Sequence, residues 1–345
     1  MNFNAIEHAL PELRQNDSRT THCFLTSAIN SAVHSMHLCA IESFMQQTNY
    51  KPIRIADGLR AITSFSFQPR HHRSTIFFQS TGLSNLLTMP ISALLRYRRV
   101  YYLHEPTALS TKLSNGDPLL KALAMQIVQL SDCFWSNTIL VSNETLRART
   151  PALFCCAASK IKIAPLLLPT PTKSTKKRNR ITYLGRIDSR RYFDEFLESA
   201  SVFKKNGFVP TILTGDVAKL QRYAGNLSSL EFIDIYAKKN FSEDLKTKLL
   251  LESSLIWNPK RCDIAQSGVT ADALRFGTLI VLSKFDPDFE ILQEKGIAVD
   301  YDAMDINSLR PLGPTEAAEG TTTANSLYEQ RHGYVAFTKS YLPIL

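Results

Sequence analysis

The sequence lacks the short motifs that mark several common enzyme classes. None of its 13 glycines forms a G-x-G pair, and no G-x-x-x-x-G-K-[ST] or G-x-S-x-G pattern occurs. The first two absences argue against a nicotinamide dinucleotide fold and a P-loop nucleotidase, because these motifs supply their phosphate-binding turns. The third argues against an α/β-hydrolase, whose nucleophile lies in that pattern. The six cysteines include no C-x-x-C pair, so neither a zinc site nor a disulfide framework is expected.

Long apolar runs are also missing. The most apolar long stretch, residues 117–130 (DPLLKALAMQIVQL), is shorter than the roughly 20 residues that a bilayer crossing requires. Residues 1–20 carry charges throughout and contain no apolar core of a secretory signal. We therefore expect a cytoplasmic protein.

Length and charge indicate a two-domain protein with an anionic partner. A chain of 345 residues exceeds the roughly 250–300 at which single cores stop growing. The net charge of +9 favours nucleic acid, an acidic membrane surface or a phosphorylated small molecule. The basic residues are spread along the chain and form no RRM, zinc-finger or helix-turn-helix pattern, so we do not expect nucleic-acid binding. The run 96–102 (RYRRVYY) suggests a peripheral contact with an acidic membrane.

Short β-rich runs alternate with helical patterns almost from end to end. The predicted strands are 23–27, 53–56, 75–78, 100–103, 138–141 and 161–164, then 181–184, 211–214, 230–233, 255–258, 278–283 and 297–301. Helices are predicted at 83–99 with a basic last turn, at 193–205, at 242–253 with Ser242 as N-cap, and at 268–276 ended by Gly277. These spacings leave room for crossover helices, and they predict parallel, doubly wound sheets.

The amino-acid composition of the chain changes at one point. Residues 165–180 (PLLLPTPTKSTKKRNR) combine three prolines with a basic run, which is typical of a linker. The predicted fold is therefore α/β, with two tandem Rossmann-like domains that face each other across a cleft. They comprise residues 1–168 and 181–325. Residues 326–345 are predicted to form a final helix that packs back across the junction.

The residues after each strand are candidate site residues, because ligands of open α/β sheets bind beyond the carboxyl ends of the strands. One strand is followed by Gly185, Arg186 and Ile187, with Arg191 five residues after Arg186. The helix predicted at 268–276 ends with Asp272, Ala273, Leu274 and, three residues on, Gly277.

These two motifs resemble those of the GT-B glycosyltransferases in the large retaining group-1 family (family 4). That family carries G-R-[LI] with a lysine five residues after the arginine, and E-A-[ML]-x-x-G at a helix end. The resemblance covers residues 181–302 well and the first half only in outline. It implies the GT-B fold and transfer of a sugar from a nucleotide-diphosphate sugar to a glycan, lipid-linked or protein acceptor. It also implies that residues 181–325 bind the nucleotide sugar and residues 1–168 the acceptor.

The residues themselves fit this chemistry. Breaking a sugar–phosphate bond leaves negative charge on the diphosphate, which the guanidinium groups of Arg186 and Arg191 are suited to neutralise. Ser267 and Gly268 lie at a helix N-terminus, where free N–H groups attract phosphate. The resemblance assigns ribose binding to Asp272. Each residue also has a purely structural alternative. The arginines could form surface ion pairs, Ser267 and Gly268 could only cap the helix, and Asp272 could face solvent.

Two further segments of the sequence depart from the family. The first glutamate of its Glu-x7-Glu pair falls on Ile264, and Asp263 replaces it only if the loop shifts by one residue. The glycine-rich acceptor loop is replaced by residues 27–37 (SAINSAVHSMH). We predict acceptor contacts from Asn30, His34 and Glu105, and a contact of His104 with the donor sugar, the alternative for His104 being a structural role.

No metal and no cofactor are expected. The pairs D-P-D (286–288) and D-Y-D (300–302) imitate a metal-binding D-x-D, but so short a pattern often arises by chance. Asp286 followed by Pro287 is interpreted as an N-cap and the first helical residue. The predicted function is a metal-independent, retaining glycosyltransferase. The alternative is a catalytically silent protein of the same fold that binds a sugar or nucleotide.

Overall fold

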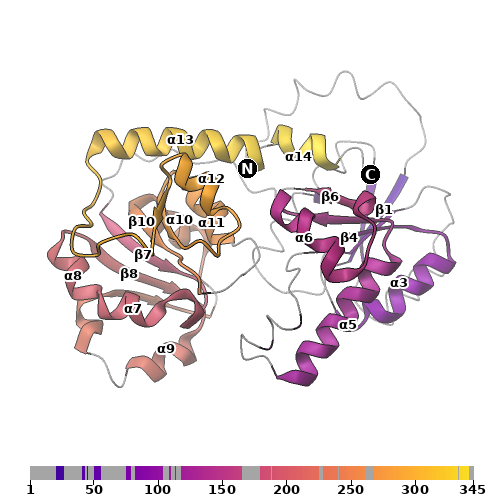
Figure 1. Ribbon diagram of the computed structural model, residues 1–345, viewed down its shortest axis with the longest axis horizontal. Helices are drawn as coiled ribbons and strands as arrows, with labels where there is room; N and C mark the ends of the chain where they lie inside the picture. The colour runs from indigo at the N-terminus through magenta and orange to yellow at the C-terminus, as the bar shows by residue number, and fades with distance from the viewer. Residues whose placement is uncertain are drawn as a thin grey trace. The chain divides into compact units, whose positions relative to one another are not determined.

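A computed structural model of the chain describes most of its residues. They are 21–26, 41, 42, 45, 50–55, 75–78, 82–103, 109, 113, 118–164, 179–187, 189–224, 228–239, 241–261, 268–332 and 334–341. The described residues fall into two compact units, Met1–Pro169 with His332–Leu345, and Thr170–Arg331. Each unit contains one sheet of parallel strands (Figure 1). The α/β class and the two Rossmann-like sheets are therefore confirmed.

The first unit holds the sheet of order β2-β1-β3-β4-β5-β6. Its strands are β1 (Thr21–Thr26), β2 (Tyr50–Ile55), β3 (Thr75–Phe78), β4 (Arg98–Tyr102), β5 (Thr138–Val141) and β6 (Ile161–Ile163). Its longer helices are α3 (Asn85–Leu94), α5 (Leu119–Trp135) and α6 (Glu144–Phe154). The strands β3 and β5 are buried at every position, as expected for a sheet covered on both faces.

The second unit has the strand order β12-β11-β10-β7-β8-β9. Its strands are β7 (Arg180–Leu184), β8 (Val209–Thr214), β9 (Asp234–Ala237), β10 (Ser253–Trp257), β11 (Leu279–Leu282) and β12 (Ala298–Asp300). Numbered within the unit, this is the order 3-2-1-4-5-6 of dinucleotide-binding sheets. The chain therefore reverses its direction of travel between β7 and β10.

Helices cover both faces of the second sheet. They are α7 (Phe193–Glu198), α8 (Ala200–Lys205), α9 (Val217–Ala224), α10 (Glu243–Glu252), α11 (Gly268–Phe276), α12 (Phe289–Glu294) and α13 (Pro314–His332). In Figure 1, α7 and α9 lie on one side of the strands and α10 and α11 on the other. Aromatic rings fill the core beneath α7 and α8, where Trp257 packs 5.8 Å from Phe196 and 5.7 Å from Phe203, between ring centroids.

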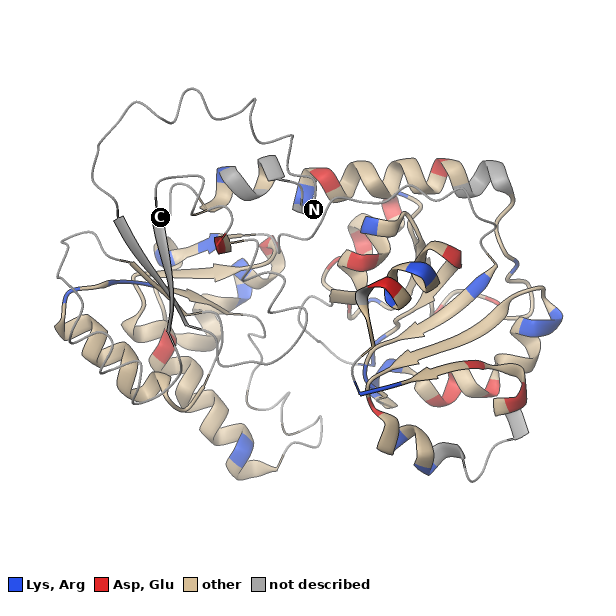
Figure 2. Ribbon diagram, turned by 180° about the vertical axis from the view of Figure 1, so that it is seen from behind, with Lys and Arg blue, Asp and Glu red and all other residues tan. Residues whose placement is uncertain are grey.

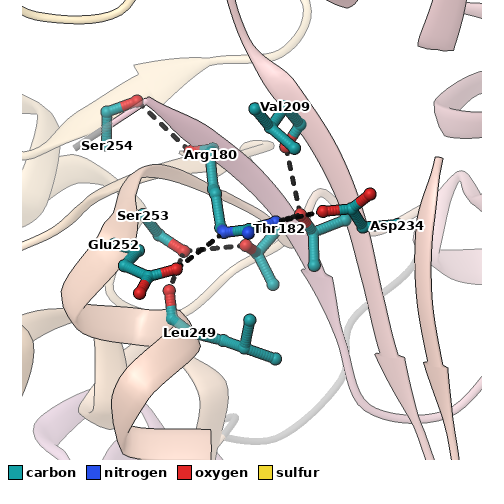
Figure 3. Close-up of polar contacts among 9 residues, drawn as sticks. Arg180, Thr182, Val209, Asp234, Leu249, Glu252, Ser253 and Ser254 are labelled. Carbon is teal, nitrogen blue, oxygen red and sulfur yellow. Dashed lines mark hydrogen bonds and ion pairs between the residues drawn. The ribbon is translucent and has the colours of Figure 1, made fainter. Parts of the chain in front are cut away.

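Arg180 ties the amino end of this sheet together (Figure 3). Its Nε lies 3.0 Å from Glu252 of α10, and its Nη1 lies 2.6 Å from Asp234 of β9. The same Nη1 donates to Thr211 of β8 over 2.9 Å. This network lies at the opposite end of β7 from Gly185, and it is therefore structural.

The last helix, α14 (Tyr334–Tyr341), belongs to the first unit. Tyr341 is fully buried, and its ring centroid lies 6.3 Å from that of Phe77 in β3. The predicted final helix thus occurs as two helices, α13 and α14, that belong to different units. Within the described residues, no helix is long and apolar enough to cross a membrane.

Candidate functional site

The candidate site lies at the carboxyl ends of β7 and β10. Because the strand order reverses between these neighbours, their following loops diverge to opposite faces and leave room for a ligand. Gly185 and Arg186 follow β7, and Asn258 follows β10. The loops are joined, since the backbone N–H of Arg261 donates to the carbonyl of Arg190 over 2.8 Å.

Gly185 brings three predicted elements together. Its φ of +109° is a conformation that residues with a side chain rarely adopt. A methyl group built on its Cα would lie 3.3 Å from Nη1 of Arg191 and 3.9 Å from a methyl group of Val269. The strand end, the guanidinium of Arg191 and the first turn of α11 therefore meet at this glycine.

The loop that carries Arg186 is held by hydrogen bonds to its backbone. The Tyr183 hydroxyl donates to the carbonyl of Arg186 over 2.6 Å, and the N–H of Ile187 donates to Asp216 over 3.0 Å. Lys219 donates to the carbonyl of Ile187 over 3.0 Å. The side chain of Arg186 is exposed, so the loop is fixed while its guanidinium faces solvent.

Both predicted phosphate-binding arginines keep their guanidinium groups available. Among the described residues, no carboxylate forms an ion pair with Arg186 or Arg191. The neighbouring Arg261 differs, because it pairs with Glu195 and its guanidinium carbon lies 4.5 Å from the centre of the Tyr192 ring. Arg261 therefore braces the site, whereas the other two arginines can accept an anion.

The helix α11 begins at Gly268 and is buried from Val269 to Phe276. Its first turn presents backbone N–H groups that have no partner within the helix, beside the guanidinium of Arg191. Together, a helix N-terminus and a neighbouring arginine form an arrangement that binds phosphate. Ser267, predicted to belong to this turn, lies outside the described residues.

Asp272 already has a cationic partner. Its Oδ2 lies 2.7 Å from Nζ of Lys246 on α10, and each side chain is only 7% exposed. Sequence reasoning missed Lys246, which in the sequence is one of two lysines in the helix Glu243–Glu252 and belongs to no motif. The lysine compensates the burial of the carboxylate, which would be costly alone, and it holds Asp272 in one position.

The D-P-D pair forms a buried ion-pair network. Lys260, fully buried, lies 2.5 Å from Asp286, and Arg331 lies 2.9 Å from Asp288. Burial and the neighbouring Asp286 raise the pKa of Asp288, and Arg331 opposes this shift. The interpretation of Asp286 as an N-cap was wrong: α12 begins at Phe289, after Asp288. No group of three His, Cys, Asp or Glu side chains suited to a metal occurs in the described part of the chain.

Several predicted site residues fall outside the part of the chain that the structure describes. They are Asn30, His34, His104, Glu105, Asp263 and Ile264. The structure therefore joins Gly185, Arg191 and the start of α11 into one site, with Arg186 on the same loop. The roles of the other residues stay predictions.

Comparison with known proteins identifies the fold. The HepE protein of Anabaena, solved in complex with UDP-glucose, aligns with 94% of this chain and 99% of its own at a TM-score of 0.67 and 11% identity. Sucrose-phosphate synthase of Thermosynechococcus elongatus aligns with 94% and 98% at a TM-score of 0.67 and 10% identity. The UDP-forming α,α-trehalose-phosphate synthase of Burkholderia vietnamiensis aligns with 94% of this chain and 97% of its own at a TM-score of 0.61 and 9% identity.

These neighbours are glycosyltransferases of the GT-B fold, and this chain has that fold. No protein-family model and no curated protein matches the sequence. The resemblance is therefore structural and extends over nearly the whole chain.

Proposed function

We propose that the protein is a glycosyltransferase that moves a sugar from a nucleotide-diphosphate sugar to an acceptor. The observation that carries the proposal is the meeting of Gly185, Arg191 and the first turn of α11 at the switch point of the second sheet. The GT-B neighbours, one in complex with UDP-glucose, support the same donor class.

The proposed mechanism follows from charge. Departure of the nucleoside diphosphate places negative charge beside Arg186, Arg191 and the N-terminus of α11. Fixed cations at that position stabilise the oxocarbenium-like transition state more than the bound donor, which accelerates the reaction. We propose transfer with retention, in which the departing phosphate takes the proton of the acceptor. With these cations present, no metal is required.

We assign the remaining contacts by sequence. Asp272 accepts from the ribose hydroxyls, with Lys246 fixing its carboxylate. Asp263 and His104 contact the donor sugar, and Ser267 adds an N–H or hydroxyl at the phosphate. The first unit supplies the acceptor contacts Asn30, His34 and Glu105, for a glycan, lipid-linked or protein acceptor.

A peripheral contact with an acidic membrane is part of the proposal. Arg96 and Arg98 of the run 96–102 are exposed, which supports a contact with anionic lipid. Tyr97, Tyr101 and Tyr102 are buried in the first unit, so the cations of this run and not its tyrosines would make the contact.

Donor binding is tested by thermal shift with UDP-glucose. Ligand at about 100 times its Kd adds roughly 2.7 kcal/mol of apparent stability. Arg186→Ala should abolish the shift, because it removes a phosphate partner without disturbing the loop backbone. Arg222→Ala, at an exposed arginine of α9 in the same unit, is the control and should keep the full shift. An unchanged shift in Arg186→Ala would contradict the phosphate assignment.

The second candidate is a catalytically silent protein that binds the donor. It is favoured by Ile264, an apolar residue where the resembling family carries a glutamate. The two candidates differ in product formation. A transferase releases UDP from UDP-glucose when an acceptor is present, whereas the silent protein gives the thermal shift and releases none.

A further inference from the structure

Exposed apolar side chains are concentrated in one part of the first unit. Of the eleven large hydrophobic residues that are well exposed in the described chain, nine lie between residues 83 and 134. The nine are Leu83, Leu87, Leu94, Leu113, Leu119, Leu120, Ile127, Leu130 and Phe134. Such a concentration is unusual, because monomeric proteins rarely expose large contiguous apolar patches without a binding role.

Helical spacing places most of these residues on one surface. Leu87 and Leu94 are seven residues apart on α3, and Leu120, Ile127 and Phe134 follow at the same interval on α5. An interval of seven residues returns to the same face of a helix after two turns. Since α3 and α5 pack against each other, the two stripes can form one surface. We call the exposed apolar residues of α3 and α5 the α3–α5 surface.

The exposed charged residues on the two helices, and those directly after α3, are cations. The helix α3 contains no charged residue, and the only charges of α5 are Lys121, which is exposed, and Asp132, which is fully buried. Arg96 and Arg98 follow α3 and are exposed. Figure 2 shows both helices as almost continuous tan ribbons. The surface is therefore apolar, bordered by cations and free of exposed carboxylates on its two helices.

We infer that the α3–α5 surface docks on an anionic lipid bilayer. Apolar side chains enter the boundary between head groups and acyl chains, while nearby lysine and arginine side chains contact anionic head groups. A second copy of the chain fits less well, because it would bring cations against cations with no exposed carboxylate on these two helices to pair with them. The inference specifies the residues of the membrane contact within the proposed function, and it does not depend on donor binding.

The experiment is flotation of the full-length protein with vesicles of phosphatidylcholine and phosphatidylglycerol, against vesicles of phosphatidylcholine alone. Wild type should float with the anionic vesicles, and less so at high salt. Ile127→Asp should partition roughly tenfold more weakly, because a carboxylate replaces an apolar side chain at the interface and repels anionic lipid. Arg96→Gln should weaken binding about fivefold, the change expected for one basic residue near the surface.

Ile291→Asp is the matched control. Ile291 is an exposed isoleucine on a helix of the second unit, 43% exposed against 57% for Ile127. It should float like wild type. Equal loss in both variants, or a wild type that stays at the bottom of the gradient, would overturn the inference. So would a wild-type dimer that Ile127→Asp converts to a monomer while no vesicle binding occurs.

A thermal shift with UDP-glucose separates this inference from the proposed function. Ile127→Asp should keep the wild-type melting temperature and the wild-type shift, since Ile127 is far along the chain from the second unit. If flotation succeeds and no variant responds to UDP-glucose, the donor proposal fails and the membrane inference stands. If the thermal shift is present and flotation fails, the membrane inference fails and the donor proposal stands.

Discussion

Gly185 links backbone conformation to the candidate site. Alanine at this position is disfavoured twice, by the φ of +109° and by the 3.3 Å approach of Arg191 to the added methyl group. We expect Gly185→Ala to lower the free energy of unfolding by about 1–3 kcal/mol. It should also weaken UDP-glucose binding, because Arg191 must move away. Urea denaturation and calorimetric titration measure the two effects.

Gly296→Ala is a control that separates the backbone strain of a positive φ from the steric contact of an added methyl group. Gly296 also has a positive φ, +67°, but an added methyl group would meet nothing within 4 Å. Its substitution should cost roughly 1 kcal/mol of stability and leave donor affinity unchanged. If both variants lose affinity equally, the effect of Gly185→Ala comes from general destabilisation and not from Arg191.

Asp132 is a second residue whose role can be measured, through the pH dependence of stability. It is fully buried between α3 and the first sheet, where Asn85 donates to its Oδ2 over 3.0 Å. Among the described residues, its Oδ1 has no hydrogen-bond partner. Burial raises the pKa of Asp132 to about 8, although hydrogen bonds from Asn85 and Tyr101 lower it. The folded state therefore holds a proton that the unfolded state has lost at neutral pH.

The sign of the pH dependence follows. A raised folded-state pKa gives stability that is complete below the unfolded value, near pH 4, and is lost as the pH rises to about 8. Asp132→Asn keeps the shape of the neutral acid and cannot ionise. At pH 8 it should be about 1–3 kcal/mol more stable than wild type, and this gain should vanish near pH 4. Denaturation across this range, with a gain that does not change with pH, would contradict the assignment.

Single residues of the site were predictable only where a motif named them. Gly185 and Arg191 were found because the strand, the glycine and the arginine spacing form a recognisable pattern. Lys246 was missed, since its importance arises from the packing of α10 beside α11, which brings it to Asp272. An ion pair between side chains on two different helices leaves no pattern in the sequence of either helix.

At the scale of elements, the strands were predictable because buried parallel strands are continuous apolar runs. Eleven of the twelve predicted strands overlap observed ones. The exception is 230–233: residues Ser228–Phe232 form a 3-10 helix, and β9 begins at Asp234. Leu230 and Phe232 pack against the core, whereas β9 is a half-exposed strand at the edge of the sheet, so hydrophobicity marked the wrong segment.

Helix ends were less predictable than helix positions. The predicted basic last turn at 83–99 was wrong, because α3 ends at Leu94, and Arg98 and Arg99 belong to β4. The left-handed φ of Arg96, +62°, makes the sharp turn between them. Ser242 caps α10 by accepting from the N–H of Leu245, and Gly277 ends α11 with a φ of +61°, both as predicted.

The Arg180 network tests how the elements of the second unit are joined. Arg180→Ala leaves Glu252 and Asp234 without their common cation at the amino end of the sheet (Figure 3). We expect a loss of about 1–3 kcal/mol, between the values for exposed and buried pairs. Arg180→Lys should recover only part of it, because a lysine cannot reproduce the fork of three contacts. Donor binding at the carboxyl end should persist in both, as titration at low temperature would show.

At the scale of the whole molecule, the chain leaves the first unit near residue 169 and returns to it at residue 332. The return occurs between two consecutive helices, so α13 and α14 stabilise different units. Tyr328 of α13 is 1% exposed in the second unit, and Tyr341 of α14 is fully buried in the first. Tyr328 and Tyr341, thirteen positions apart, are therefore buried in the cores of different units.

This arrangement predicts opposite effects of two similar substitutions. Tyr341→Ala removes a ring packed on Phe77 and should destabilise the first unit by about 3–5 kcal/mol, whereas Tyr328→Ala should do so for the second. Hydrogen–deuterium exchange under native conditions measures each locally. Tyr341→Ala should speed exchange in β3 and leave α11 unchanged, and Tyr328→Ala should do the reverse. If either variant loosened both segments equally, the two units would unfold as one, and α13 and α14 would act as a single brace.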